Sequence, residues 1–288
     1  MRDETTFLRA AEIIGGADAL IIAAGAGIGV DSGLPDFRSN NGFWNTYPAL
    51  AAAQMDFTEV ASPSNFEKNP ELAWGFYGHR LKMYRDTVPH EGFATLKEWG
   101  DTVPLGAWVY TSNVDGAFQK AGFSEKKVHE CHGSIHWMQC MNDCQSGLWP
   151  ADDFKPDVDA EQCRLLNALP TCPNCGGLAR PNIVMFGDWN WNHARREQQR
   201  RKEALWLETL ASSGGNVAIV ELGAGSEIPA VRQFSHRMSQ EYGGRIVRIN
   251  PREFEVPSTR DVGIPMGALE ALKGIRAAMK ESRASCDR

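Results

Sequence analysis

Short apolar runs alternate with longer amphipathic stretches along this chain. Four short runs are rich in apolar residues that favour strands, on both faces of the strand: 19–25, 105–111, 217–223 and 245–250. Four longer stretches repeat apolar residues at the spacing of a helix: 5–14, 70–85, 192–211 and 265–280. Strands that are apolar on both faces and separated by helices are typical of a parallel sheet covered on both sides. The pattern therefore predicts an α/β fold.

Two segments interrupt this alternation. Residues 40–87 are helical and loop-like and contain several aromatic residues, while residues 129–181 hold most of the seven cysteines with scattered proline and glycine. We expect these segments to form a smaller inserted domain, made of a helical module and a zinc-ribbon module. The Rossmann-like sheet domain is then expected from the remaining segments: 1–39, 88–128 and 182–288.

Composition and charge exclude several classes of protein. The chain has 288 residues, of which 42% are hydrophobic, and a formal net charge of −6. A negative net charge disfavours direct binding of nucleic acid, and no apolar run approaches the roughly 20 residues that a membrane helix needs. The charged N-terminus lacks the continuous apolar stretch of a secretory signal. We therefore expect a cytoplasmic protein with neither nucleic-acid nor membrane partners.

A glycine-rich loop follows the first predicted strand, in ALIIAAGAGIGVDSGLPDFRS. Gly25 and Gly27 allow the backbone to turn tightly and to approach a pyrophosphate at the start of a helix. Val30 replaces the third glycine of a standard dinucleotide fingerprint, and Gly33 and Pro35 shorten the following helix to about a turn and a half. The alternative is a plain strand-to-helix turn without a ligand.

The run GAGIGVDSGLPDFR resembles the NAD-binding loop of the sirtuins, the NAD-dependent protein-lysine deacylases, which usually reads G-A-G-x-S-x-x-S-G-[IL]-P-D-F-R. The resemblance implies a Rossmann-like loop that holds NAD while nicotinamide is expelled. It implies NAD contacts from Gly25, Ala26, Gly27, Asp36, Phe37 and Arg38. One departure is Gly29, where the family usually has serine. Further motifs in the family's order extend the resemblance from about residue 7 to residue 275.

The second predicted strand ends in Thr111-Ser112-Asn113-Val114-Asp115, at the sheet edge where open α/β folds bind ligands. From the residues alone, Asn113 is equally a helix cap. The segment is similar to the family motif T-Q-N-I-D. That similarity implies NAD contacts from Ser112, Asn113 and Asp115 and a catalytic role for Asn113, with Ser112 in place of the usual glutamine.

Three histidines lie in HECHGSIHWMQC, at positions 129, 132 and 136. An imidazole titrates near neutral pH and can deprotonate a hydroxyl group, although a lone histidine is more often structural. His132-Gly133-Ser134 resembles the family's H-G-[ST] motif and lies eight residues before Cys140. By this resemblance His132 is the general base, whereas His129 and His136 match no motif.

Four cysteines form two close pairs, Cys140 with Cys144 and Cys172 with Cys175. Four thiolates from two tight turns make a closed tetrahedral site that suits one structural zinc ion. The alternative is a set of reduced, buried thiols. Cys163 lies between the pairs as a possible substitute ligand, and two further cysteines, at 131 and 286, are expected to be spare.

The second cysteine pair continues into CPNCGGLARPNIVMFGD, which resembles the family's C-P-x-C-x-G-x-x-R-P-x-V-V-x-F-G-E. The resemblance implies that the substrate peptide pairs with this run as an added strand. The residues implied to bind the substrate are Val184, Met185, Phe186 and Gly187. Asp188 stands where glutamate is usual. From the residues alone, NIVMF is a buried strand, and Ile183 is expected to be buried in either case.

The third and fourth predicted strands end in ELGAGSEIPAVR and RINPRE. In the family these places carry G-T-S and I-N, which contact the phosphates and the adenosine. The resemblance implies NAD contacts from Gly223 and Gly225 through their backbones, from Asn250, and from Ala268. The two hydroxyl groups of G-T-S are missing here.

The resemblance implies NAD-dependent removal of acyl groups, with acetyl as the expected one, from protein lysines, releasing nicotinamide and O-acyl-ADP-ribose. The alternative on the same fold is an NAD glycohydrolase or ADP-ribosyltransferase, suggested by Ser112, Gly29 and the altered run 223–225. A third hypothesis is a non-catalytic NAD-sensing protein or a zinc-ribbon interaction protein. We find no convincing Tyr-x-x-Arg pair of the kind expected for negatively charged acyl chains, so a short neutral acyl group is the default. The protein substrates and the oligomeric state stay open.

Overall fold

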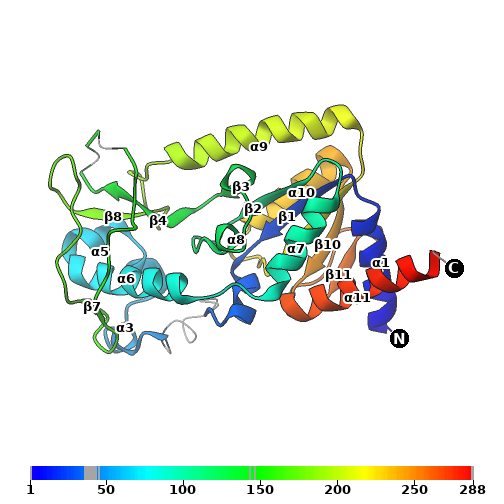
Figure 1. The fold of residues 1–288 in the computed structure, drawn as a ribbon. Coiled ribbons are helices and arrows are strands. Elements are labelled where there is room, and N and C mark those ends of the chain that lie inside the picture. Colours follow the sequence, from blue (N-terminus) through cyan, green and yellow to red (C-terminus); the bar gives the residue numbers. More distant parts are fainter. Residues whose placement is uncertain (1, 36–43, 45, 143, 146, 287–288) are drawn as a thin grey trace.

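The computed structural model describes residues 2–35, 44, 46–142, 144–145 and 147–286 and contains one large parallel sheet (Figure 1). Its six strands lie in the order β11-β10-β9-β1-β2-β3. Their bounds are β1 Ala19–Ala24, β2 Ala107–Thr111, β3 Val128–Glu130, β9 Val217–Leu222, β10 Arg245–Ile249 and β11 Val262–Ile264. The chain begins in the middle of the sheet and builds outward on both sides, which places the ends of β1, β2 and β9 next to one another.

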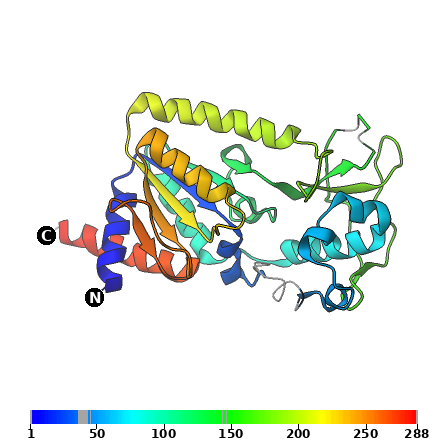
Figure 2. The ribbon, with the colours of Figure 1, turned by 180° about the vertical axis from the view of Figure 1, so that it is seen from behind.

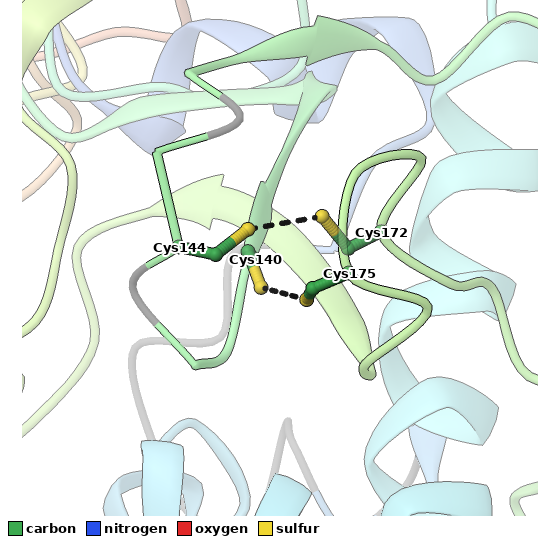
Figure 3. A group of neighbouring side chains, drawn as sticks. All are labelled: Cys140, Cys144, Cys172 and Cys175. Atoms are coloured by element: carbon green, nitrogen blue, oxygen red, sulfur yellow. Dashed lines mark hydrogen bonds between the residues drawn. The ribbon is translucent and has the colours of Figure 1, made fainter.

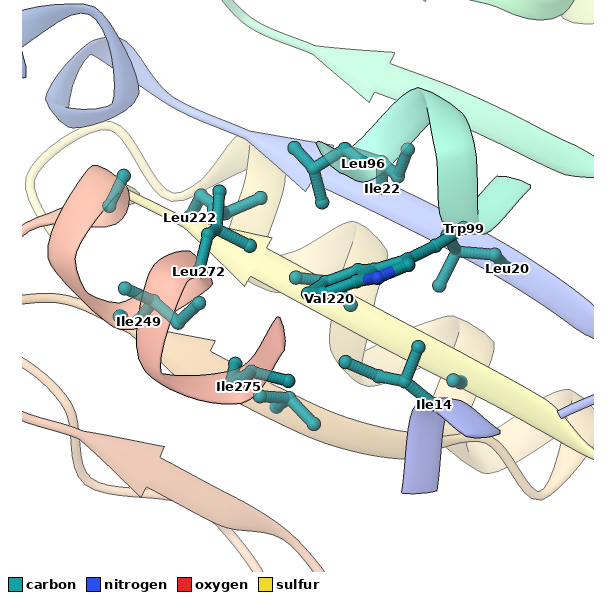
Figure 4. Packing of buried hydrophobic residues seen from close by; sticks show 14 of the residues in the cluster. Ile14, Leu20, Ile22, Leu96, Trp99, Val220, Leu222, Ile249, Leu272 and Ile275 are labelled. Atoms are coloured by element: carbon teal, nitrogen blue, oxygen red, sulfur yellow. The ribbon is translucent and has the colours of Figure 1, made fainter. Parts of the chain in front are cut away.

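Helices cover both faces of this sheet. One face packs against three helices, α1 Arg2–Gly15, α7 Glu91–Thr102 and α11 Ala268–Cys286. Figure 4 shows how residues such as Trp99 and Leu272 reach the strand residues Leu20, Ile22 and Val220. Alternate residues of the same strands, including Ile21 and Ile219, face α9 Ala194–Ser213 and α10 Ala230–Tyr242. Burial on both faces explains why the residues of these strands are mostly apolar at odd and even positions alike.

A second hydrophobic core lies beside the sheet domain (Figure 2). Its helices are α3 Pro48–Ala52, α4 Phe57–Val60, α5 Pro63–Lys68 and α6 Pro70–Asp86. Its strands are β4 Gly133–Cys140, β5 Trp149–Pro150 and β8 Ala179–Ile183, which form an antiparallel sheet, and the pair β6 Val158–Asp159 and β7 Arg164–Leu165. Trp74, Phe76 and Tyr77 of α6 are fully buried in this core, so the aromatic residues of the predicted helical module serve to pack it.

The predicted fold class is confirmed, and the predicted strands and helices match observed ones. The helix after β1 is a 3-10 helix, η1 Ala26–Ser32, and is short, as Gly33 and Pro35 predicted. Of the run NIVMF, only Asn182 and Ile183 belong to a strand, because β8 ends at Ile183. Ile183 is buried, as expected. The domain boundaries stay a prediction, and the one between 181 and 182 falls inside β8. Within the described part of the chain, no helix is both long and apolar enough to cross a membrane.

Candidate functional site

The glycine loops after β1 and β9 pack backbone against backbone. The N–H of Gly27 donates to the carbonyl oxygen of Gly223 at 3.0 Å. A Cβ atom on Gly223, whose φ is +59°, would lie 2.4 Å from the Gly27 backbone, and one on Gly25 would lie 2.8 Å from the Gly223 oxygen. Only glycine fits such an approach, so these glycines bring the two loops together at the sheet edge. Ala26 lies exposed between them. Three residues expected in the same loop, Asp36, Phe37 and Arg38, lie outside the described residues.

The end of β2 is tied to the end of β1. The Thr111 hydroxyl and the Ser112 N–H both donate to the carbonyl oxygen of Ala24, at 2.9 and 3.1 Å. Asn113 Nδ2 donates to the carbonyl oxygen of Gly25 at 3.2 Å. Asp115 accepts a hydrogen bond from the Ala117 N–H at 2.8 Å, and its burial raises the pKa of its carboxyl group. The structure therefore brings the predicted residues of the first two loops into direct contact.

His132 lies just after β3, beside this loop. Its half-buried ring is hydrogen-bonded to the Ser112 backbone, and its carbonyl oxygen accepts from the Val184 N–H at 3.0 Å. The pKa of the His132 imidazole is lowered by burial and by the nearby Arg196 cation, against the hydrogen bond to the Ser112 backbone, which raises it. The lowered pKa favours a neutral ring at physiological pH, which is the form that can accept a proton.

The glycine after His132 is required by packing. Gly133 has φ +85°, and a Cβ atom there would lie 2.1 Å from the carbonyl oxygen of Asn182 in β8. Without a side chain, β4 can start in contact with β8, which sets the place of His132 relative to the run 184–187. The H-G-[ST] motif thus has a structural reason in this chain.

The other two histidines of this segment have structural partners. His129 is buried, and its Nδ1 lies 2.5 Å from a carboxylate oxygen of Glu203 on α9. His136 Nε2 is 2.8 Å from the carbonyl oxygen of Asp115. His136 thus meets the far end of the loop after β2, at Asp115, whereas the ring of His132 meets Ser112 at its start.

On the other side of the sheet edge, Asn250 follows β10. Its Nδ2 donates to the carbonyl oxygen of Ala224 at 2.8 Å, and its Oδ1 accepts from the backbones of Arg252 and Glu253. It therefore holds the loop that contains Gly225. Ala268 is buried at the start of α11.

The run 184–187 lies between His132 and the helical module. Val184 N–H donates to His132, and Phe186 N–H donates to the carbonyl oxygen of Ala61 at 3.0 Å. The Phe186 ring packs edge-on against Phe57 of α4, at 5.8 Å between centroids. Since these two N–H groups are used within the chain, an added peptide strand would have to pair with the remaining backbone groups of the run.

The four paired cysteines converge, as Figure 3 shows. Their sulfur atoms all lie within 4.8 Å of one another, with Cys140 and Cys175 at 3.5 Å and Cys144 and Cys172 at 3.3 Å. Four thiolates around a tetrahedral zinc, with Zn–S of about 2.3 Å, have their sulfurs about 3.8 Å apart. The geometry and the donor set therefore fit the single structural zinc that the sequence predicted.

The remaining cysteines lie apart from this group as far as the structure describes them. Cys163 is buried in the second core and is not a ligand. Burial raises the pKa of the Cys131 thiol to about 11, so it stays protonated.

One feature that the sequence analysis missed lies on α6. Tyr77 and Arg80 have the Tyr-x-x-Arg spacing, and both are buried. Arg80 donates to the Tyr84 hydroxyl from Nε and NH2, at 3.1 and 2.7 Å, and its guanidinium lies 5.3 Å from the centroid of the Phe76 ring. The spacing was present in the sequence, although the sequence analysis found no convincing pair of this kind.

Comparison with known proteins places this chain in a family. A model of the Sir2 family matches residues 25–214. The chain belongs to the Sir2 family. Among Sir2-family relatives, it is 28% identical to the NAD-dependent protein deacylase of Aquifex aeolicus, over 92% of this chain and 97% of that protein. It is 30% identical to the NAD-dependent protein deacylase of Thermococcus kodakarensis, over 94% and 95%.

Solved Sir2 structures share the fold. One is a Sir2 homolog in complex with NAD, with a TM-score of 0.67 and 24% identity over 94% of this chain and 93% of that one. Another, described as a structural basis for the mechanism and regulation of Sir2 enzymes, has a TM-score of 0.66 and 25% identity over 98% and 100%. The family predicted from the order of the motifs is confirmed.

Proposed function

We propose that this Sir2-family chain is an NAD-dependent protein-lysine deacylase that uses NAD as a co-substrate and releases nicotinamide and O-acyl-ADP-ribose. The observation that carries the proposal is the position of His132. Its ring meets the loop of Ser112, while its backbone meets Val184. A base that lies between the loop after β2, proposed to bind NAD, and the run 184–187, proposed to bind the peptide, suits a reaction between NAD and an acyl-lysine. Relatives that align with nearly the whole chain are named NAD-dependent protein deacylases.

We assign the site residues as follows. NAD would lie over the sheet edge, near Gly25, Ala26, Gly27, Ser112, Asn113, Asp115, Gly223, Gly225, Asn250 and Ala268, together with Asp36, Phe37 and Arg38. The acyl-lysine peptide would lie along Val184, Met185, Phe186 and Gly187. The single zinc would stabilise the small domain through Cys140, Cys144, Cys172 and Cys175, and it would take no part in the reaction because four protein ligands leave no open position.

In this proposal His132 acts as the general base. A neutral imidazole can accept the proton of a ribose hydroxyl, and the burial that lowers its pKa keeps it neutral. Asn113, held by Thr111 and Gly25, is positioned to orient groups at the same edge. NAD supplies the electrophilic ribose carbon, and the chain supplies the base, the orientation and a partly dry site.

Acetyl is the first candidate for the acyl group, and a negatively charged acyl chain is the second. The second is suggested by the Tyr-x-x-Arg spacing of Tyr77 and Arg80 on α6. An acidic acyl chain could pair with the Arg80 guanidinium.

The test is to incubate the protein with NAD, with and without acetyl-lysine and succinyl-lysine peptides, and to follow nicotinamide release and peptide mass together. We expect nicotinamide to appear only with peptide, and His132→Ala to abolish deacylation while NAD still binds. Equal nicotinamide release without peptide would instead support the NAD glycohydrolase. That second function is suggested by Ser112, which replaces the family's glutamine. A cytoplasmic location and the lack of nucleic-acid partners stay predictions.

A further inference from the structure

Trp189 is 96% exposed, although the chain on both sides of it is anchored. On one side, the Asp188 carboxylate forms two hydrogen bonds with the Arg180 guanidinium, at 2.6 and 2.8 Å, and both side chains are buried. On the other side, the carbonyl oxygen of Asn190 accepts from Gln139 Nε2 at 2.9 Å. The exposed indole therefore belongs to a held backbone rather than to a loose loop.

The anchoring extends to the residues that follow. Asn182 Nδ2 donates to the carbonyl oxygen of Asn192 at 2.8 Å, and the Asn192 N–H donates to Gln139 Oε1 at 3.1 Å. Gln139 and Asn182 are themselves buried in β4 and β8 and are bonded to each other at 2.9 Å. Two strands of the small domain thus hold the whole turn from 188 to 192.

This turn continues directly from the run proposed to bind the peptide. The Asp188 carboxylate also accepts from the Met185 N–H at 3.3 Å, so one ion pair fixes both the run and the turn. Phe186 in the run is 44% exposed and rests on Phe57. Two exposed aromatic rings, three residues apart, are therefore presented by one anchored segment.

A tryptophan side chain that is exposed leaves in water an aromatic surface of about 150–250 Å² that burial would cover. Aromatic side chains on rigid backbones are typical of the few positions that carry most of the affinity in an interface. The indole continues the run proposed to bind the peptide, so an apolar side chain of that peptide is the ligand that this exposed ring suits best.

We infer that Trp189 is a platform for a large apolar side chain of the substrate, next to the acyl-lysine in its sequence. The inference rests on the proposed deacylase function and adds a sequence preference to it. A second copy of this chain is the competing occupant of the exposed indole.

The test uses acetyl-lysine peptides that carry either Phe or Ser at each of the two positions on either side of the lysine. For at least one position, we expect the Phe peptide to have a kcat/KM about 5–20-fold higher, mainly through KM. Trp189→Ala should reduce the ratio of kcat/KM between the Phe and Ser peptides to about 1–2. Trp189→Phe should keep most of the wild-type ratio. The matched control is Leu205→Ala, which truncates another exposed apolar side chain, on α9. It should keep the wild-type ratio.

Two outcomes overturn the inference while leaving the deacylase function in place. One is turnover of all peptides with no preference for Phe. The other is a preference for Phe that Trp189→Ala does not change. If light scattering then shows that Trp189→Ala converts a dimer into a monomer, the exposed indole binds a second copy of the chain instead of the substrate. If none of the acyl peptides is turned over, the proposed function itself fails, and the inference fails with it.

Discussion

The protonation state of one residue, His132, decides the pH range of the proposed reaction. Its pKa lies below 6.5, its ordinary value, because burial and, to a smaller extent, the Arg196 cation outweigh the hydrogen bond to the Ser112 backbone, which raises it. Since the neutral ring is the active form, the acid limb of kcat/KM should lie below pH 6.5. Replacing Arg196 by Gln removes a positive charge that disfavours the protonated ring, so the pKa should rise and the limb should move to higher pH.

The measurement is the pH profile of kcat/KM for the wild type and for Arg196→Gln. Arg200→Gln is the matched control, because Arg200 lies on the same helix and pairs with Glu197. Its profile should coincide with that of the wild type. An identical midpoint in Arg196→Gln would show that Arg196 does not act on His132.

At the scale of elements, neighbouring strands β9 and β10 share a buried ion pair. Arg248 Nε lies 2.5 Å from Glu221 Oε1, and the two side chains are 10% and 1% exposed. Removing one partner leaves a charge buried without compensation, which costs about 3–5 kcal/mol. We therefore expect Glu221→Ala to lower the free energy of unfolding by about that amount.

Denaturant unfolding followed by circular dichroism would measure this loss. Glu98→Ala is the control, because Glu98 pairs with Arg276 at a similar distance but on the surface. Such an exposed pair contributes about 0–1 kcal/mol. Equal losses in the two variants would mean that burial adds nothing to the pair between the strands.

The same scale shows what the sequence could predict. The strands around β1 were predictable because both of their faces are buried, so residues such as Ile21 and Ile22 are both apolar. Strand β3 was not predicted, because its three residues include the polar His129 and Glu130, whose burial depends on partners from α9. Helix α10 was missed although Val231, Phe234 and Met238 have helical spacing, so a signal was present.

The candidate site residues were assigned through motifs, while the contacts that hold them in place could be found only in the structure. The sequence does not show that Gly223 contacts Gly27, because these residues lie far apart in the chain. It also does not show that Asp188 pairs with Arg180, because that contact depends on how the intervening turn folds. The exposure of Trp189 was equally out of reach, since an isolated tryptophan in a sequence reads as a core residue.

At the scale of the whole molecule, strands β4 and β8 connect the cysteine cluster to the proposed reaction site. Cys140 is the last residue of β4, and His132 directly precedes its first residue. In β8, Ala179 pairs with Cys140 and Ile183 pairs with Gly133, one residue before Val184. Cys140 and His132, the predicted ligand and the proposed base, therefore lie at opposite ends of one pair of strands.

Loss of the zinc should therefore reach the substrate site while leaving the large sheet intact. Structural zinc sites contribute directly to folding energy, and the first sheet has its own core. We expect Cys172→Ser to lose about one zinc per chain, to reduce kcat/KM for acyl peptides, and to speed hydrogen exchange in β4 and β8 but not in β1 and β9. Cys286→Ser, at the end of α11, should keep the metal and the activity. Metal content unchanged in Cys172→Ser, or exchange raised equally in both sheets, would contradict this coupling, because the strands that join the two sites would then be stable without the ion.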